Sequence, residues 1–133
     1  MVVRIDFNRT LEHFKDGYLP PDVKVVLLLQ ELLERHFREE HDPKFYVQRV
    51  GMSERRLNGL LKKFLGRTIY QLIQDRIHEE AVKLLLYTTL TVKEISYGLG
   101  VCHPSWFSRH FRKLTGLNPR QYRVKFRVEN MFS

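Results

Sequence analysis

The residues of this sequence best suited to chemistry are concentrated in one short segment, residues 100–113, which reads GVCHPSWFSRHFRK. The segment holds the chain's lone cysteine, Cys102, its lone tryptophan, Trp106, and two histidines, His103 and His110. Cysteine and histidine can ligate a metal ion or form a nucleophile–base pair. The three basic side chains of the same segment suit a third role, contact with another polymer.

Neither a metal site nor a catalytic site is supported by the spacing. Cys102 and His110 are eight residues apart and face different sides of a helix end, and no fourth ligand is near them in sequence. A Cys–His pair would also need an oxyanion loop and a third, orienting residue, which the sequence does not show. We therefore expect no metal, no cofactor and no enzyme activity.

Charge is distributed unevenly along the chain. Residues 1–43 carry six basic and nine acidic side chains, whereas residues 44–127 carry 17 basic and five acidic ones, a net charge of +12. A surplus of this size favours a polyanionic partner, either nucleic acid or an acidic membrane face. The alternative is a basic domain whose charge serves solubility alone.

Composition also bears on location. The sequence shows no N-terminal signal segment, and its longest apolar run, residues 25–29, is too short to span a bilayer. A single cysteine allows no internal disulfide and fits a reducing compartment. We expect a cytoplasmic protein without a membrane contact.

A proline pair divides the chain near its start. Pro20 and Pro21 forbid a helix across them, and Asp22 is placed to cap the next helix, which its apolar spacing predicts over about residues 23–39. Residues 1–21 are predicted to be a linker or the tail of an upstream region, with a short possible helix from Thr10 to Lys15.

The first of two similar segments lies after this helix. A short apolar stretch ends at a turn containing Gly51, and Ser53 can cap a second helix that Gly66 closes. The predicted inner face of this second helix is Leu57, Leu60, Leu61 and Phe64.

The second segment repeats the pattern. Thr91 and Glu94 form a T-x-x-E capping box, a turn follows at Gly100, and a longer helix begins near Pro104. Its predicted inner face is Phe107, His110, Phe111 and Leu114. Adding 50 to the residue numbers carries Leu57 onto Phe107, Leu61 onto Phe111 and Gly66 onto Gly116. A short helix, a glycine turn and a longer helix form a helix-turn-helix, here duplicated.

The whole pattern predicts an all-α fold of about seven helices, with two helix-turn-helix subdomains joined by a long linker helix. The predicted domain covers residues 22–127. Within it we expect the first helix-turn-helix at about 44–66, the linker helix at about 69–87, the second helix-turn-helix at about 91–116, and a final helix starting at Asn118-Pro119. Residues 128–133 are predicted to form a C-terminal tail.

Residues 76–123 strongly resemble the C-terminal signature of the AraC/XylS family of bacterial transcription regulators. The resemblance rests on the turn Gly100, the run Pro104–Arg109, and the pattern Thr115-Gly116-x-Asn118-Pro119-x-x-Tyr122-Arg123, and it extends more loosely over residues 23–127. It implies a DNA-binding domain of two helix-turn-helix motifs, which often follows an N-terminal sensor or dimerisation domain. The chain departs from the family's usual residue types at Val47, Gly59, Ser96, Val101 and His103.

Each longer helix presents an outward stripe that suits DNA. Residues 55, 58, 59 and 62 share one stripe, and residues 105, 108, 109 and 112 share its equivalent. Arginine and asparagine can make bidentate contacts to guanine and adenine, and serine suits several base edges. The candidates for base reading are Arg55, Asn58, Gly59, Pro104, Ser105, Trp106, Ser108 and Arg109. The candidates for phosphate contact are Arg56, Lys62, Lys63, Arg112 and Lys113.

Simpler interpretations accompany these candidates. Arg55 and Arg109 could be ordinary solvated arginines, and Trp106 could serve packing alone. Arg76 lies beside Asp75, Glu79 and Glu80 in sequence, which indicates a structural role.

The leading hypothesis is a sequence-specific transcription regulator that inserts two recognition helices into adjacent major-groove segments of double-stranded DNA. RNA polymerase and an upstream sensor or dimerisation domain are expected as its other partners. The alternatives are a nonspecific or architectural nucleic-acid-binding protein, and a DNA-repair enzyme carrying such a module. One cysteine in the whole chain argues against the repair enzyme.

Overall fold

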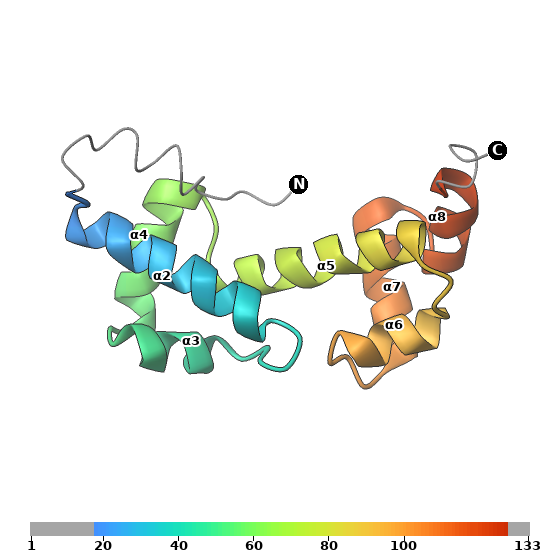
Figure 1. Cartoon of the computed structure of the whole chain (residues 1–133), viewed down its shortest axis with the longest axis horizontal. Coiled ribbons are helices and arrows are strands. Elements are labelled where there is room, and N and C mark those ends of the chain that lie inside the picture. Colours follow the sequence, from blue (N-terminus) through green and yellow to red (C-terminus); the bar gives the residue numbers. More distant parts are fainter. Residues whose placement is uncertain (1–17, 128–133) are drawn as a thin grey trace. The chain divides into compact units, whose positions relative to one another are not determined.

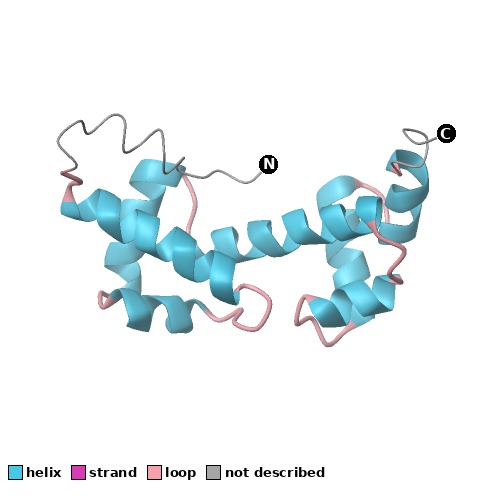
Figure 2. Cartoon of the chain, viewed as in Figure 1, coloured by secondary structure: helices cyan, strands magenta, loops and turns pink. Residues whose placement is uncertain are grey.

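The computed structural model describes residues 18–127, which form seven α-helices and no strand (Figures 1 and 2). The helices are α2 (Pro21–His36), α3 (Pro43–Val50), α4 (Glu54–Leu65), α5 (Ile69–Tyr87), α6 (Val92–Gly98), α7 (Pro104–Thr115) and α8 (Pro119–Phe126). The all-α prediction is confirmed. The possible helix from Thr10 to Lys15 and the tail at 128–133 lie outside the described residues.

The chain divides into two compact units, one ending at Asp75 and the other beginning at Arg76. The division falls inside α5, so the first turns of this helix belong to the first unit and its last turns belong to the second. Each unit therefore contains one helix pair, α3–α4 or α6–α7, together with one end of α5.

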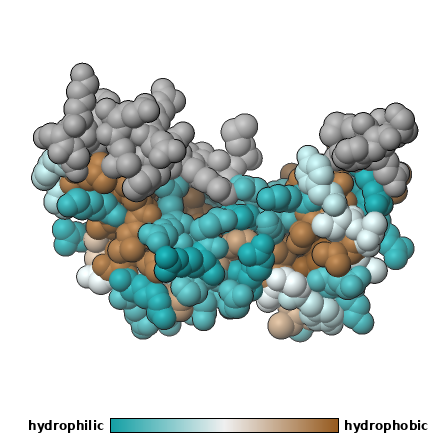
Figure 3. Space-filling model, viewed as in Figure 1, coloured by the Kyte–Doolittle hydropathy of each residue, from teal (hydrophilic) through white to brown (hydrophobic). Residues whose placement is uncertain are grey.

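In the first unit, α2 packs against α3 and α4. The buried residues of α2 are Val23, Val26, Leu29 and Leu33, and Phe37 follows at its end. Leu28 is exposed, because the buried stripe of α2 is narrower than its apolar stripe. Figure 3 shows hydrophobic side chains reaching the surface over α2.

The predicted cap of α2 is wrong. Pro20 occupies the N-cap position and makes no side-chain capping bond, while Asp22 lies within the first turn of the helix. An acidic residue in this turn still interacts favourably with the positive end of the helix dipole.

The first helix-turn-helix is framed by local side-chain bonds. Asp42 caps α3 by accepting from the N–H of Lys44, and Ser53 caps α4 by accepting from the N–H of Arg56. Between them Gly51 adopts φ +79°, a left-handed conformation that favours glycine. The fully buried Tyr46 donates its hydroxyl to the carbonyl of Glu40 at 2.8 Å. Burial raises the pKa of Tyr46 well above its usual value, and the nearby charge of Glu40 adds to the effect.

The second helix-turn-helix shows the predicted capping box. The hydroxyl of Thr91 accepts from the N–H of Glu94, and the carboxylate of Glu94 accepts from the N–H of Thr91. These bonds lower the pKa of Glu94 from its usual value. The buried Ser96 donates its hydroxyl to the carbonyl of Val101 at 2.6 Å, which ties α6 to the residue after the turn.

The buried faces of α4 and α7, the second helix of each helix-turn-helix, are narrower than predicted. In α4 the buried residues are Leu57, Leu61 and Leu65, which recur every four positions. In α7 the buried residues are Phe107 and Phe111. Leu114, predicted to lie on the inner face, is 54% exposed. Residues three positions after a buried one lie at the edge of such a face, so apolar character alone did not place them correctly.

The helices that follow α4 and α7 begin in the same way. Thr68 and Gln71 exchange hydrogen bonds between side chain and backbone at the start of α5, and Asn118 and Gln121 do the same at the start of α8. Both pairs satisfy backbone N–H groups that a helix start would otherwise leave without partners.

Charged side chains of α5 make contacts in each unit. In the first unit Arg67 makes a two-pronged contact with Asp75, at 2.9 and 2.7 Å. In the second unit the buried Arg76 lies 3.8 Å from Glu80, which agrees with its predicted structural role. At the other end of α5, Arg123 donates to the carbonyl of Leu85 at 2.9 Å. Burial lowers the pKa of Arg123, as does the charge of Arg127.

Candidate DNA-binding surface

The exposed side of α4 is strongly basic. Arg55, Arg56, Lys62 and Lys63 are all exposed, whereas the opposite side of the helix is buried. Within residues 18–127, the guanidinium groups of Arg55 and Arg56 make no hydrogen bond or ion pair, so both can reach another molecule. The ammonium of Lys63 lies 5.5 Å from the centre of the Phe64 ring.

Two members of the predicted α4 stripe differ from the basic residues. The side-chain oxygen of Asn58 accepts the N–H of Ile69 at 2.9 Å, so it points toward the start of α5. Gly59 is exposed and offers only its backbone. A Cβ added at Gly59 would meet no atom within 4 Å, so the position is open.

The exposed side of α7 carries the equivalent stripe. Ser105, Arg109, Arg112 and Lys113 are exposed, and Pro104 and Ser108 are half-buried. Phe107 and Phe111 hold the opposite side in the core of the second unit. The predicted α7 residues thus lie together on the outer side of one helix.

Trp106 has a fixed neighbour. Its ring stacks on the ring of His110 one turn later, with the centres 4.9 Å apart and the planes inclined by 6°. Trp106 remains 43% exposed, so one part of the indole packs while another part can meet a ligand. The Nε2 atom of His110 is buried and has no hydrogen-bond partner in the described part of the chain.

The helices α4 and α7 begin differently. Ser53 caps α4 with its side chain, whereas His103 occupies the cap position of α7 without a side-chain bond. The first N–H groups of α7 therefore receive no acceptor from the side chain at the cap position. Pro104 compensates in part, because its fixed φ suits a first helical position.

Other chemistry finds little support in the described residues. Among residues 18–127, no three His, Cys, Asp or Glu side chains gather to hold a metal ion. Cys102 is exposed. None of the helices in the described range is both long and apolar enough to cross a membrane.

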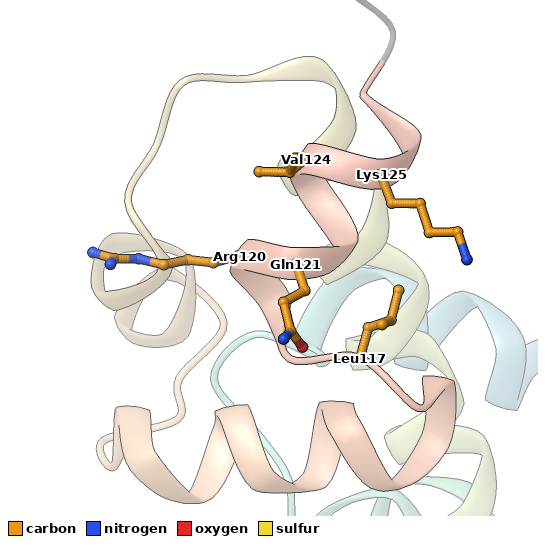
Figure 4. Close-up of a pocket in the computed structure, with 5 residues that line it drawn as sticks. All are labelled: Leu117, Arg120, Gln121, Val124 and Lys125. Carbon is orange, nitrogen blue, oxygen red and sulfur yellow. The ribbon is translucent and has the colours of Figure 1, made fainter.

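The predicted stripes omit two exposed cations on α8. Arg120 and Lys125 extend in opposite directions from this helix, beside a shallow and mainly apolar depression that Leu117 and Val124 also line (Figure 4). Their spacing of five residues gives no shared helical face, so the sequence offered no signal that would group them.

Taken together, two matched helix-turn-helix units with basic outer faces define a DNA-binding protein. A family model described as a helix-turn-helix domain matches residues 46–125, which is more than half of the chain. The chain belongs to this family, and its relatives place it among the AraC/XylS-type regulators.

Three curated relatives illustrate the relationship. The F1 operon positive regulatory protein of Yersinia pestis is 39% identical over 74 residues, covering 56% of this chain and 25% of that protein. The arabinose operon regulatory protein of Escherichia coli strain K12 is 27% identical over 117 residues, covering 87% of this chain and 40% of that protein. The bifunctional transcriptional activator/DNA repair enzyme AdaA of Bacillus subtilis strain 168 is 26% identical over 114 residues, covering 85% of this chain and 54% of that protein. The chain therefore spans about half or less of the length of these relatives.

Solved structures agree with the fold. The C-terminal domain of AraT, a response regulator from Geobacillus stearothermophilus, matches with a TM-score of 0.73 at 27% identity, covering 83% of this chain and 89% of that one. The DNA-binding domain of the global transcriptional factor AdpA, solved in complex with a target DNA, matches with a TM-score of 0.69 at 26% identity, covering 84% of this chain and 96% of that one.

Proposed function

We propose that this chain is a sequence-specific DNA-binding regulator of transcription, with α4 and α7 as its two recognition helices. The observation that carries the proposal is the matched construction of these helices. Each buries apolar residues on one side and presents basic side chains on the other, and Lys62 and Lys63 of α4 lie 50 residues before Arg112 and Lys113 of α7. A recognition helix needs both features, since one side must pack while the other enters the major groove.

Residue types divide the proposed contacts into two classes. Arg55 and Arg109 are the proposed readers of guanine, because a guanidinium can donate to both O6 and N7. Ser105 and Ser108 suit base edges, while Pro104 and the exposed part of Trp106 suit a thymine methyl group. The proposed phosphate contacts, which position the protein without reading sequence, are Arg56, Lys62, Lys63, Arg112 and Lys113.

The remaining parts of the proposal concern the protein's surroundings. A regulator of this type acts on bacterial DNA in the cytoplasm and influences RNA polymerase. Because the chain corresponds to only part of its curated relatives, we propose that a sensor or dimerisation domain can accompany it. Contact with DNA, rather than catalysis, is the function we assign, although one relative combines such a domain with repair activity.

Selection from random duplexes tests the proposal. The full chain is incubated with duplexes of random sequence, and the bound fraction is amplified and sequenced over several rounds. We expect enrichment of a site with two dissimilar boxes, because the α4 stripe and the α7 stripe carry different side chains. Binding without any enriched sequence would instead identify a nonspecific or architectural protein.

A further inference from the structure

The start of α5 is held by a side chain from α4. The backbone N–H of Ile69, the first residue of α5, donates to the side-chain oxygen of Asn58 at 2.9 Å. Ile69 is fully buried, so water is poorly placed to replace this acceptor. A buried N–H that loses its partner is costly to the folded state, which makes Asn58 difficult to remove without consequence.

The internal repeat offers a comparison within the same chain. Fifty residues further on, Ser108 replaces Asn58 and Pro119 replaces Ile69. Proline has no N–H, so the first residue of α8 needs no acceptor. Within the described residues the hydroxyl of Ser108 makes no hydrogen bond, whereas the side-chain oxygen of Asn58 makes this one. The asparagine therefore occurs in the first unit, where the next helix, α5, begins with a residue that has an N–H to donate.

The same contact limits what Asn58 can do toward DNA. Asparagine reads adenine through two bonds at once, with its oxygen accepting from N6 and its amide nitrogen donating to N7. In this structure the oxygen already accepts from Ile69. The bond aims this oxygen at the start of α5 rather than at a base edge, which is unfavourable for the bidentate arrangement.

We propose that Asn58 is a positioning residue, which fixes the start of α5 against the first recognition helix and sets the direction in which the linker helix leaves α4. This inference rests on the proposed function in one respect, that α4 reads DNA. It replaces base reading at Asn58 and leaves the other proposed contacts unchanged.

Three variants of the full chain separate the two roles. Asn58→Ala removes the acceptor. Asn58→Asp keeps an oxygen at the same place, and a carboxylate is favourable near a helix N-terminus. Ser108→Ala is the matched control, because it changes the equivalent position, where no N–H needs a partner.

The first measurement needs no DNA. Amide hydrogen exchange at Ile69 is followed in each variant by NMR, together with thermal unfolding. We expect Asn58→Ala to speed exchange at Ile69 by about tenfold or more, Asn58→Asp to restore protection, and Ser108→Ala to leave the thermal midpoint unchanged. Two results overturn the inference, whatever the DNA measurements show. One is an Ile69 amide that stays equally protected in Asn58→Ala, and the other is an Ile69 amide that is already unprotected in the unaltered protein.

The second measurement uses selected duplexes in which the distance between the two boxes is varied. A residue that sets the direction of α5 controls which distance is preferred. For Asn58→Ala, we expect the ratio of affinities for the best spacing and for other spacings to fall by about tenfold. Its preference for each base within the boxes should be unchanged. Asn58→Asp should restore the spacing preference. The affinities of this variant for different spacings are compared as a ratio, because the added negative charge lowers its affinity for every duplex.

The opposite pattern overturns the inference. If Asn58→Ala loses preference at one base pair and keeps its spacing preference, Asn58 reads that base. If the unaltered chain shows no preferred sequence at all, the proposed function fails, and exchange at Ile69 still decides whether Asn58 positions α5.

Discussion

Arg109 and Lys113 lie one turn apart on α7 and are both exposed. Substituting each in turn distinguishes a contact that reads a base from a contact that only binds the phosphate backbone. We expect Arg109→Ala to lower affinity for the selected site by about 1–3 kcal/mol and to relax preference at one base pair. Lys113→Ala should weaken binding to all sequences alike, because an ammonium on a phosphate carries no sequence information. Titrations with selected and scrambled duplexes measure both effects.

Equal losses on the selected and the scrambled duplex for Arg109→Ala would remove Arg109 from the base readers. Arg55→Ala provides the same test in the first unit, where its effect should fall on a different base pair.

Gly59 lies within the helix α4, where glycine carries an entropic cost relative to alanine. An added Cβ meets no atom within 4 Å, so Gly59→Ala should stabilise the protein by about 0.5–1 kcal/mol. Urea unfolding followed by circular dichroism measures the change.

Gly66→Ala is the matched control for this stability prediction. The space around Gly66 is equally open, but its φ of +69° disfavours any side chain. We expect this variant to be less stable by about 1–2 kcal/mol. Destabilisation of both variants to the same extent would show that local space and φ do not explain the result.

Residue types and periodicity predicted most of the outer faces of α4 and α7, because arginine and lysine rarely lie inside a small helical unit. They did not predict the contact of Asn58, since its partner Ile69 becomes a neighbour only after the chain reverses between α4 and α5. They also placed Leu114 on the wrong side, because an apolar residue at the edge of a helical stripe can be exposed at little cost.

At the scale of elements, most helix boundaries followed from local chemistry, although α2 begins and ends earlier than the predicted range of about 23–39. Proline begins α3, α7 and α8, and a left-handed glycine ends α3, α4 and α7. The predicted bounds of the linker helix coincide with those of α5, which contains no glycine or proline. Such signals act within a few residues, so they can be read without knowing the fold.

The end of α5 depends on a partner that is distant in sequence. Arg123 of α8 donates its Nε to the carbonyl of Leu85 and its Nη2 to the carbonyl of Thr88. These carbonyls lie at or just beyond the end of the helix, where carbonyl groups lack helical partners. We expect Arg123→Ala to destabilise the second unit by on the order of 2 kcal/mol, measured by urea unfolding.

Lysine should not replace Arg123. Its single ammonium lacks the planar fork that reaches two carbonyls at once, so Arg123→Lys should remain closer in stability to the alanine variant than to the unaltered protein. Full stability in Arg123→Lys would show that charge alone, rather than the two-pronged geometry, holds this end of α5.

At the scale of the whole molecule, one uninterrupted helix of 19 residues joins the two units. At 1.5 Å per residue it extends for about 28 Å, close to the roughly 34 Å that separate successive major-groove segments on one side of the duplex. We expect one chain to read two boxes about one turn apart. Inserting about 5 base pairs, half a turn, should reduce affinity to that of a single box, as measured by titration.

A second insertion tests the role of the helix itself. Adding about 10 base pairs returns the second box to the same side of the DNA but moves it a full turn away. A continuous helix cannot extend to follow it, so affinity should stay low. Recovery at this spacing would mean that the units are joined flexibly and act independently.

The open position at Gly59 has an evolutionary consequence. A single nucleotide change converts any glycine codon into an arginine codon, and a Cβ added at Gly59 meets no atom within 4 Å. We therefore expect that a larger side chain at this position, and with it a new contact to DNA, requires no repacking of the core. When the sequence of a target promoter drifts, this position allows the protein to follow in one mutational step, whereas a residue such as Asn58, tied to the next helix, is constrained by the fold.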